Sequence, residues 1–509
     1  MTTYITTAIP FVNAAPHLGH ALELVHVDAV ARWHRQRGRP VRSLTGTDDN
    51  ALKNVHAARA AGQAVAPFVA TSGDRFVALA AALDCAFDDV IRTAADPRHR
   101  PGVERLWRAC ADAGDLERRR YEGRYCLGCE AFVDDRDLVD GRCAEHLVVP
   151  ERVSEENWFF RLSRYAEAIG DAIATGRLHV VPEQRTAEIV AWCANGVPDL
   201  SVSRPAQRAC GWGIPVPDDP SQVVYVWFDA LANYVTALGY GSLDPAFARW
   251  WTGSTERVHL VGKGIVRFHA LIWPAILASA GLAWPTTIAV HDYLTVGGRK
   301  LSKSLGNAVG AATIVDRHGG DAVRWWLLRA VPPVGDADFT DEALLTLADA
   351  DLANGFGNLV SRVVALVRRS RRGIVPGGAP PPSTEVVERI DASIARFDLR
   401  TATGALLGHV GTLNRGLERD QPWVLARAEA AGSGEAGRRL DDVLAAAVSE
   451  CRQLAELLSP FTPTLAARAA ALLGGTGHTL VSEAVLYPRS ACDGGTGRAP
   501  SAVGSDRCH

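Results

Sequence analysis

The sequence predicts an α/β part with a doubly wound parallel sheet, followed by an all-α helical bundle. The chain opens as strand, helix and strand within its first 46 residues, which is the start of a parallel βαβ unit. Beyond residue 342, apolar residues recur at helical spacing almost throughout. A polar stretch from 117 to 153 holds a cysteine cluster, so we expect a small insertion to split the α/β part.

Apolar patterns place the elements of the α/β part. Residues 4–9 form a strand, and after a proline-containing turn residues 20–38 show helical spacing and end at a glycine. Residues 41–46 form a second short strand. Further strand candidates lie at 223–227, 258–261 and 287–290. The second half of the sheet is therefore expected to begin near residue 221.

The helical part is defined by two amphipathic segments, 352–370 and 441–458. A loop rich in proline and glycine lies between them at 377–383. From about residue 490 the chain is mostly Gly, Ser, Ala and Arg, which is typical of a disordered tail.

Length and composition exclude several classes of protein. A chain of 509 residues exceeds one ordinary core and indicates several domains. The formal net charge of -3 gives no global signal for nucleic acid, so any RNA contact must be local. No apolar run approaches the ~18 residues that span a bilayer, and the N-terminus lacks the features of a secretory signal. We expect a cytoplasmic protein with no membrane partner, in which disulfides are not expected.

The first motif with chemical meaning is Pro16-His17-Leu18-Gly19-His20, where the first strand gives way to a helix. A helix N-terminus is a natural anion site, and two imidazoles three residues apart share one helix face. His17 and His20 can donate to ATP phosphates, and Gly19 leaves room for an adenine ring near the backbone. The same residues also fit an ordinary helix start with two surface histidines.

The second motif is Lys300-Leu301-Ser302-Lys303-Ser304. Lys300 and Lys303, with Ser302 between them, suit the negative charge that develops on pyrophosphate. An ordinary basic surface loop would have the same composition.

The third constellation is Cys126, Cys129, Cys143 and His146, two pairs of metal-ligand type with close spacing. Three thiolates and one imidazole favour tetrahedral Zn²⁺ and leave no open position for catalysis. We therefore expect a structural zinc, although four solvated loop residues would show the same spacing.

The two motifs stand in this order nearly 300 residues apart, and together they resemble the HIGH and KMSKS motifs of class I aminoacyl-tRNA synthetases. Surrounding residues narrow the resemblance to the methionyl branch. It runs from residue 3 to about 488 and includes the stretches TTAIPFVNAAPHLGH, YEGRYCLGCEAF, EENWFFRLSRY, YVWFDALANYVTALGY and HDYLTVGGRKLSKSLGN. It implies a zinc knuckle in the insertion.

The resemblance implies a division into a split Rossmann catalytic domain and a helical-bundle anticodon-binding domain. The expected parts are a first Rossmann half at 1–116, a connective insertion with the zinc knuckle at 117–220, a second Rossmann half at 221–299, the KMSKS loop and stem-contact region at 300–345, the anticodon-binding domain at 346–490 and a tail at 491–509.

The resemblance also implies an amino-acid pocket. One acid, Asp48, matches the carboxylate that holds the substrate ammonium. The remaining positions form an apolar and aromatic slot that suits a flexible thioether. They are Ala8, Ile9, Phe11, Trp227, Ala230, Leu231, Tyr234, Ile265 and His269. Without the motifs, plain core packing would explain each apolar member.

A tRNA contact is implied in the helical part. Asn358 and Arg362 lie four residues apart on one helix face, and Trp423 can stack on an unpaired base. They match the anticodon-reading residues of the family, so a methionine tRNA is the expected partner. A helix cap and a half-buried tryptophan are the alternative explanation.

Several positions depart from the family pattern, and they suggest a divergent paralogue. Phe11 replaces a tyrosine, Asn50 replaces a histidine and Gly264 replaces an acid near the adenylate ribose. Asp292 replaces a glycine, and Gly416 replaces an aromatic residue. Each lost charge-assisted hydrogen bond costs about 1.5–3 kcal/mol unless it is compensated.

The resemblance implies an enzyme, a methionine–tRNA ligase that uses ATP and Mg²⁺ to form methionyl-adenylate and charges methionine tRNA, and we expect a monomer. One alternative is a biosynthetic paralogue that passes the activated amino acid to a small-molecule acceptor. Another is a non-enzymatic RNA-binding paralogue, against which the intact histidine and lysine motifs argue.

Overall fold

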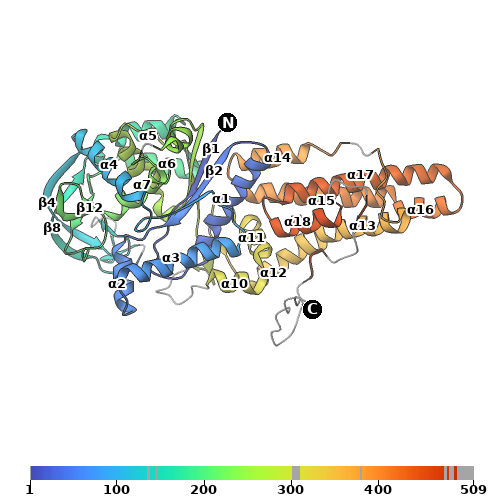
Figure 1. Cartoon of the computed structure of the whole chain (residues 1–509), viewed down its shortest axis with the longest axis horizontal. Coiled ribbons are helices and arrows are strands. Elements are labelled where there is room, and N and C mark those ends of the chain that lie inside the picture. Colours follow the sequence, from blue (N-terminus) through green and yellow to red (C-terminus); the bar gives the residue numbers. More distant parts are fainter. Residues whose placement is uncertain are drawn as a thin grey trace, which may run out of the picture. The chain divides into compact units, whose positions relative to one another are not determined.

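The structure is a computed structural model that describes residues 2–133, 138–144, 146–242, 244–300, 310–378, 381–474, 479–480 and 486–489. The chain forms two compact units (Figure 1). The sheet unit comprises Met1–Gly310, Ala330–Asp338 and Ala392–Arg400. The helical unit comprises Ala311–Arg329, Phe339–Asp391 and Thr401–His509. No helix among the described residues is long and apolar enough to cross a membrane.

A six-stranded parallel sheet is the centre of the sheet unit, in the order β3-β2-β1-β14-β15-β9. The order runs outward from β1 and β14, so the doubly wound fold is confirmed and its switch point lies between these two strands. The strands are β1 (Thr3–Thr7), β2 (Val41–Thr47), β3 (Asp89–Arg92), β9 (His179–Val181), β14 (Glu256–Gly262) and β15 (Thr287–His291).

The central strands β1 and β2 are buried on both faces, as in a parallel sheet that helices cover on both sides. The connection from β1 to β2 is α1, and all eleven residues of α7 are buried. The helices of the sheet unit are α1 (Leu18–Gln36), α2 (Leu52–Ala60), α3 (Val65–Ala82), α4 (His99–Asp112), α5 (Ala166–Ala174), α6 (Thr186–Ala194), α7 (Val226–Thr236), α8 (Pro245–Phe247) and α9 (Trp273–Ser279).

Along the chain, smaller antiparallel sheets come between strands β3 and β14 of the parallel sheet. One contains β4 (Leu116–Cys126), β5 (Ala131–Val133), β8 (Glu151–Phe160) and β10 (Leu200–Ser201). A second contains β11 (Ser203–Pro205), β12 (Pro215–Val216) and β13 (Asp219–Val224), and a two-stranded ribbon contains β6 (Leu138–Val139) and β7 (Arg142–Cys143). A hairpin leads into the lysine motif and comprises β16 (Leu294–Val296) and β17 (Arg299–Lys300). Strand β18 (Ala337–Asp338) pairs with β16 in parallel.

Two features differ from the sequence prediction. The strand expected at 223–227 ends at Val224, pairs antiparallel with β11 and β12, and gives way to α7 at Val226. The stretch 117–220, expected as one insertion, also supplies β9, which pairs with β15 at the end of the parallel sheet. Other predicted strands are found, with β14 and β15 extending one or two residues beyond 258–261 and 287–290.

The helical unit is a bundle in which amphipathic helices bury their apolar faces. Side-chain caps begin some of them, as where Ser433 Oγ accepts a hydrogen bond from Ala436 N at the start of α17. The remaining helices are α10 (Ala311–His318), α11 (Gly320–Arg329), α12 (Asp341–Ala348), α13 (Asn358–Arg371), α14 (Glu385–Ile394), α15 (Leu399–Asp420), α16 (Pro422–Ala430), α17 (Gly434–Leu458) and α18 (Pro463–Leu472).

Candidate active site

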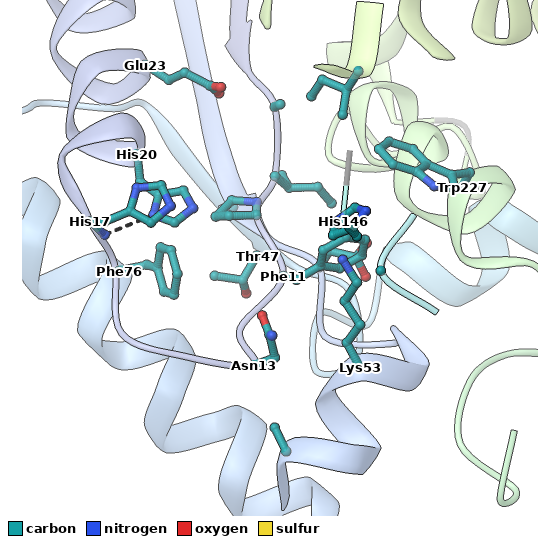
Figure 2. Close-up of a pocket in the computed structure, with 18 of the residues that line it drawn as sticks. Phe11, Asn13, His17, His20, Glu23, Thr47, Lys53, Phe76, His146 and Trp227 are labelled. Carbon is teal, nitrogen blue, oxygen red and sulfur yellow. Dashed lines mark hydrogen bonds between the residues drawn. The ribbon is translucent and has the colours of Figure 1, made fainter. Parts of the chain in front are cut away.

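A cavity of about 1320 Å³ opens where β1 and β2 end. Open α/β sheets bind ligands at this edge, beside the switch point. Among the predicted site residues, the cavity is lined by Ala8, Ile9, Phe11, His17, His20, Asp48, Trp227, Ile265 and the metal-cluster residue His146 (Figure 2).

The HLGH motif forms the N-terminus of α1 beside this cavity. His17 Nδ1 accepts a hydrogen bond from Gly19 N at 3.1 Å, and His20 Nδ1 accepts one from His17 N at 3.1 Å. The two rings stack on each other (Figure 2), and their centroids are 3.9 Å apart. Because each Nδ1 is an acceptor, a neutral ring carries its proton on Nε2, where it can donate to an anion. This arrangement suits phosphate oxygens.

Gly19 does not line the cavity. A Cβ at this position would lie 3.0 Å from Cε1 of His17, so the glycine makes room for the His17 ring to cap the helix. The structure thus gives Gly19 a role in shaping the motif, and the approach of adenine to Gly19 stays a prediction.

Asp48 follows directly on β2 and is 2% exposed. Among the described residues its Oδ1 has no hydrogen-bond partner, and Asp48 lines the cavity. Burial, together with the nearby carboxylates of Asp229 and Glu130, raises the pKa of Asp48 well above its ordinary value. A buried carboxylate with an unsatisfied oxygen is costly, so the site favours a cationic group such as a substrate ammonium.

Aromatic side chains form one wall of the cavity. The ring of Trp227 meets Phe11 edge to face at 6.2 Å and stacks on Phe268 at 3.7 Å. Phe11 lies beside Asp48 through an isolated parallel bridge. The acid and the aromatic wall are therefore neighbours, as a site for an amino acid with an apolar side chain requires.

The other predicted pocket residues form a buried layer and do not line the cavity: Ala230, Leu231, Tyr234 and His269. Within this layer, His269 Nδ1 is 2.9 Å from the carbonyl of Ile265, to which it donates. Its Nε2 therefore accepts from the hydroxyl of Tyr234, at 2.8 Å. Burial lowers the pKa of His269 to about 4, so the ring is neutral near pH 7.

The predicted metal ligands come together. Ligand atoms of Cys126, Cys129, Cys143 and His146 all lie within 4.8 Å of one another. Gly128 makes this possible, because a Cβ there would lie 2.3 Å from Cγ of His146. Three thiols and an imidazole at this spacing fit Zn²⁺, which the clustered donors would hold through three sulfurs and one nitrogen.

The lysine motif is described only in part. Lys300 lies in β17, and its backbone position follows from the hairpin with β16. Ser302 and Lys303 lie outside the described residues. Their predicted role at the phosphates stays a prediction.

In the helical unit, Arg362 on α13 donates to Asn414 Oδ1 at 3.2 Å and to Glu418 Oε1 at 2.6 Å, both on α15. Asn358 is exposed at the start of α13, and Trp423 is half-buried near the start of α16. The helices that carry these residues contact one another, since α13 packs against α16.

Two polar connections near the cavity are not evident from the sequence. Asn50 donates to Asp229 Oδ2 at 2.7 Å, and Asp229 Oδ1 is 2.5 Å from Nε2 of His99. Glu23, which lines the cavity, lies 3.0 Å from Nε2 of His291. The partners are distant in sequence, so no local pattern could have joined them. Only the position of Glu23, one turn after His20, hinted that it faces the site.

Two departures from the family pattern have visible surroundings. Asp292 accepts hydrogen bonds from Arg185 and from Gly335 N and is 4% exposed, so its added charge is neutralised. Gly264 lies in the turn Lys263–Ile265 directly after β14.

Comparison with known proteins agrees with this geometry. The family described as "tRNA synthetases class I (M)" matches residues 3–149 and 137–364, more than half of the chain. The methionine–tRNA ligase of Caldanaerobacter subterraneus subsp. tengcongensis is 37% identical over 475 residues, which cover 91% of this chain and 72% of that protein. That of Mycobacterium bovis is 36% identical over 485 residues, covering 92% of each.

Solved structures agree as well. The crystal structure of Mycobacterium tuberculosis methionyl-tRNA synthetase bound by methionyl-adenylate has a TM-score of 0.89 and 34% identity, covering 96% of this chain and 100% of that one. Its apo form has a TM-score of 0.82 and 32% identity, covering 97% and 99%. The chain therefore belongs to the methionyl-tRNA synthetases, in the class I aminoacyl-tRNA synthetase family.

Proposed function

We propose that this chain activates methionine with ATP and transfers the methionyl group to methionine tRNA. One observation carries the proposal. The buried carboxylate of Asp48, whose Oδ1 has no partner among the described residues, shares a cavity with the stacked rings of His17 and His20 at the switch point of the sheet. The cavity thus offers a place for an ammonium beside a place for phosphates.

The first step joins the two substrates. A carboxylate oxygen of methionine attacks the α-phosphorus of ATP, and the bond to pyrophosphate breaks. Nε2–H of His17 and His20 donates to phosphate oxygens as negative charge builds up, and Lys300 and Lys303 neutralise the departing pyrophosphate. Mg²⁺ accompanies ATP and supplies further neutralisation.

The amino acid is held by its two ends. Asp48 pairs with the ammonium, while Ile9, Phe11 and Trp227 enclose the side chain. Such an apolar slot takes a flexible thioether with little strain. The buried Tyr234–His269 pair supports the wall and keeps its own polar atoms satisfied.

In the second step a terminal ribose hydroxyl of tRNA attacks the methionyl carbonyl, and AMP leaves. Asn358, Arg362 and Trp423 contact the anticodon by base-edge hydrogen bonds and stacking. Transfer to a small-molecule acceptor is not favoured, because relatives named methionine–tRNA ligase match over 92% of this chain, helical part included.

Further properties belong to the same proposal. Cys126, Cys129, Cys143 and His146 hold Zn²⁺, which stabilises the insertion. The protein acts in the cytoplasm as a monomer. The six-part division from 1–116 to 491–509 remains our proposal for its domains.

The test is ATP–pyrophosphate exchange across the twenty amino acids, followed by charging of methionine tRNA. Methionine alone is expected to support exchange, and the tRNA is expected to accept methionine. Exchange with a different amino acid, or exchange without any charging, would contradict the proposed function.

A further inference from the structure

The segment that carries the metal ligand Cys129 also touches the amino-acid wall. Nε1 of Trp227 donates to the carbonyl oxygen of Cys129 at 3.4 Å. The indole lines the cavity together with the ring of Phe11 (Figure 2). The position of Cys129 therefore bears on the orientation of Trp227.

The next residue, Glu130, reaches helix α2. It is fully buried and lies in the left-handed region with φ at 53°. Its Oε1 accepts from Lys53 N at 2.7 Å, in the first turn of α2. Ala51, at the start of that helix, supplies no side-chain cap, so Glu130 supplies it from the metal loop.

Helix α2, capped in this way, contacts the segment of Asp48 and the ring of Phe11. Asn54 donates to the carbonyls of Asp48 and Asp49, at 2.9 Å each. The ammonium of Lys53 lies 4.3 Å from the ring centroid of Phe11, and Figure 2 shows the two together. The acid and the second aromatic ring thus depend on the helix that Glu130 caps.

We propose that residues 129–130 couple metal binding to amino-acid binding, with Glu130 as the positioning residue. Metal in the cluster holds this segment in the conformation in which Trp227, Phe11 and Asp48 fit the amino acid. Coupling between two sites is reciprocal, so methionine must also tighten the metal. The inference rests on the proposed function, because it takes methionine as the ligand.

The test measures the zinc affinity of the full-length protein by equilibrium competition with a chromogenic chelator, with and without saturating methionine. Methionine is expected to tighten zinc binding by about fivefold or more in the wild type. In Glu130→Gln this factor should fall toward one, while zinc content stays stoichiometric. The KM for methionine should rise and the KM for ATP should stay unchanged. Glu122→Gln is the matched control, because Glu122 lies on β4 and is exposed, and it should behave as wild type.

A measurement without variants keeps the inference open to refutation if Glu130→Gln fails to fold. Methionine affinity of zinc-loaded and zinc-depleted wild type, measured by equilibrium dialysis, must differ by the same factor as the zinc affinities with and without methionine. Equal methionine affinities, or a zinc affinity unaffected by methionine, would overturn the coupling while methionine-dependent exchange upholds the proposed function. Absence of that exchange would overturn both.

Discussion

The buried carboxylate of Asp48 lowers the stability of the folded protein and at the same time favours the binding of a cation. Burial and neighbouring carboxylates raise its pKa in the folded protein, so the folded state holds a proton on Asp48 more tightly than the unfolded chain does. Above the raised folded-state pKa, the ionised carboxylate therefore costs stability in full. This cost shrinks as the pH falls from the folded-state pKa and is gone below the unfolded-state pKa. A bound ammonium offsets the same cost.

We predict that Asp48→Asn raises the melting temperature at pH 7 while weakening methionine use. The variant removes the cost of the buried charge, but it also removes the partner of the ammonium, worth about 1.5–3 kcal/mol or roughly ten- to a hundredfold in KM. Melting curves should converge with those of wild type as the pH falls. Asp74→Asn is the control, since this side chain is 73% exposed. A lower melting temperature for Asp48→Asn at pH 7 would contradict the account.

His20 is predicted to act on the chemical step more than on binding. Its Nδ1 accepts a hydrogen bond from the backbone, so a neutral ring carries its proton on Nε2. We expect His20→Ala to lower the single-turnover rate of adenylate formation by about 10²–10³, as loss of one preorganised donor does. The matched control is His56→Asn, because His56 also lines the cavity but lies on α2. An unchanged rate with a raised KM for ATP would assign His20 to ground-state binding.

At the scale of elements, a helix or strand could be predicted from the sequence where its apolar residues recur at a clear spacing. The opening strand, helix and strand and the long amphipathic α17 have clear patterns, and the structure confirms them. Helix α7 is buried all round, so its apolar run lacks the alternation that tells a helix from a strand. Strand β9 has three residues, too few for any period.

Prediction of the site residues from the sequence is limited in the same way, by what local patterns contain. Asp48 and Trp227 were identified from motifs in the sequence, and both line the cavity. The contact between Asn50 and Asp229 spans 179 positions, so it could not be read from local spacing. Sequence patterns identified the residues, whereas the tertiary contacts that position them required the fold.

The metal loop is predicted to depend on the absence of a side chain at residue 128. Gly128→Ala would place a Cβ against the His146 ring, so His146 must move away from the thiols. We expect a lower zinc content after dialysis and a lower melting temperature, measured by metal analysis and thermal unfolding. Gly377→Ala serves as the control, because a Cβ at residue 377 would have no neighbouring atom within 4 Å. Full zinc content in Gly128→Ala would contradict the assignment of His146 as a ligand.

At the scale of the whole molecule, the two compact units separate two tasks. The cavity with Asp48, His17 and His20 belongs entirely to the sheet unit. Asn358, Arg362 and Trp423 belong entirely to the helical unit. Under the proposed function, activation of methionine therefore uses residues of the first unit, and selection of the tRNA uses residues of the second.

This separation predicts that Trp423→Ala weakens tRNA charging and leaves methionine-dependent pyrophosphate exchange intact. Loss of one base-stacking partner costs about 1–3 kcal/mol, so kcat/KM for tRNA should fall by roughly five- to a hundred-and-fiftyfold. Val424→Ala is the control, because Val424 is the neighbouring residue and is 44% exposed. A parallel loss of exchange would mean that Trp423 stabilises the fold as a whole. Unchanged charging would remove it from the anticodon contact and leave Arg362, already held by Glu418 through a 2.6 Å hydrogen bond, as the residue to test next.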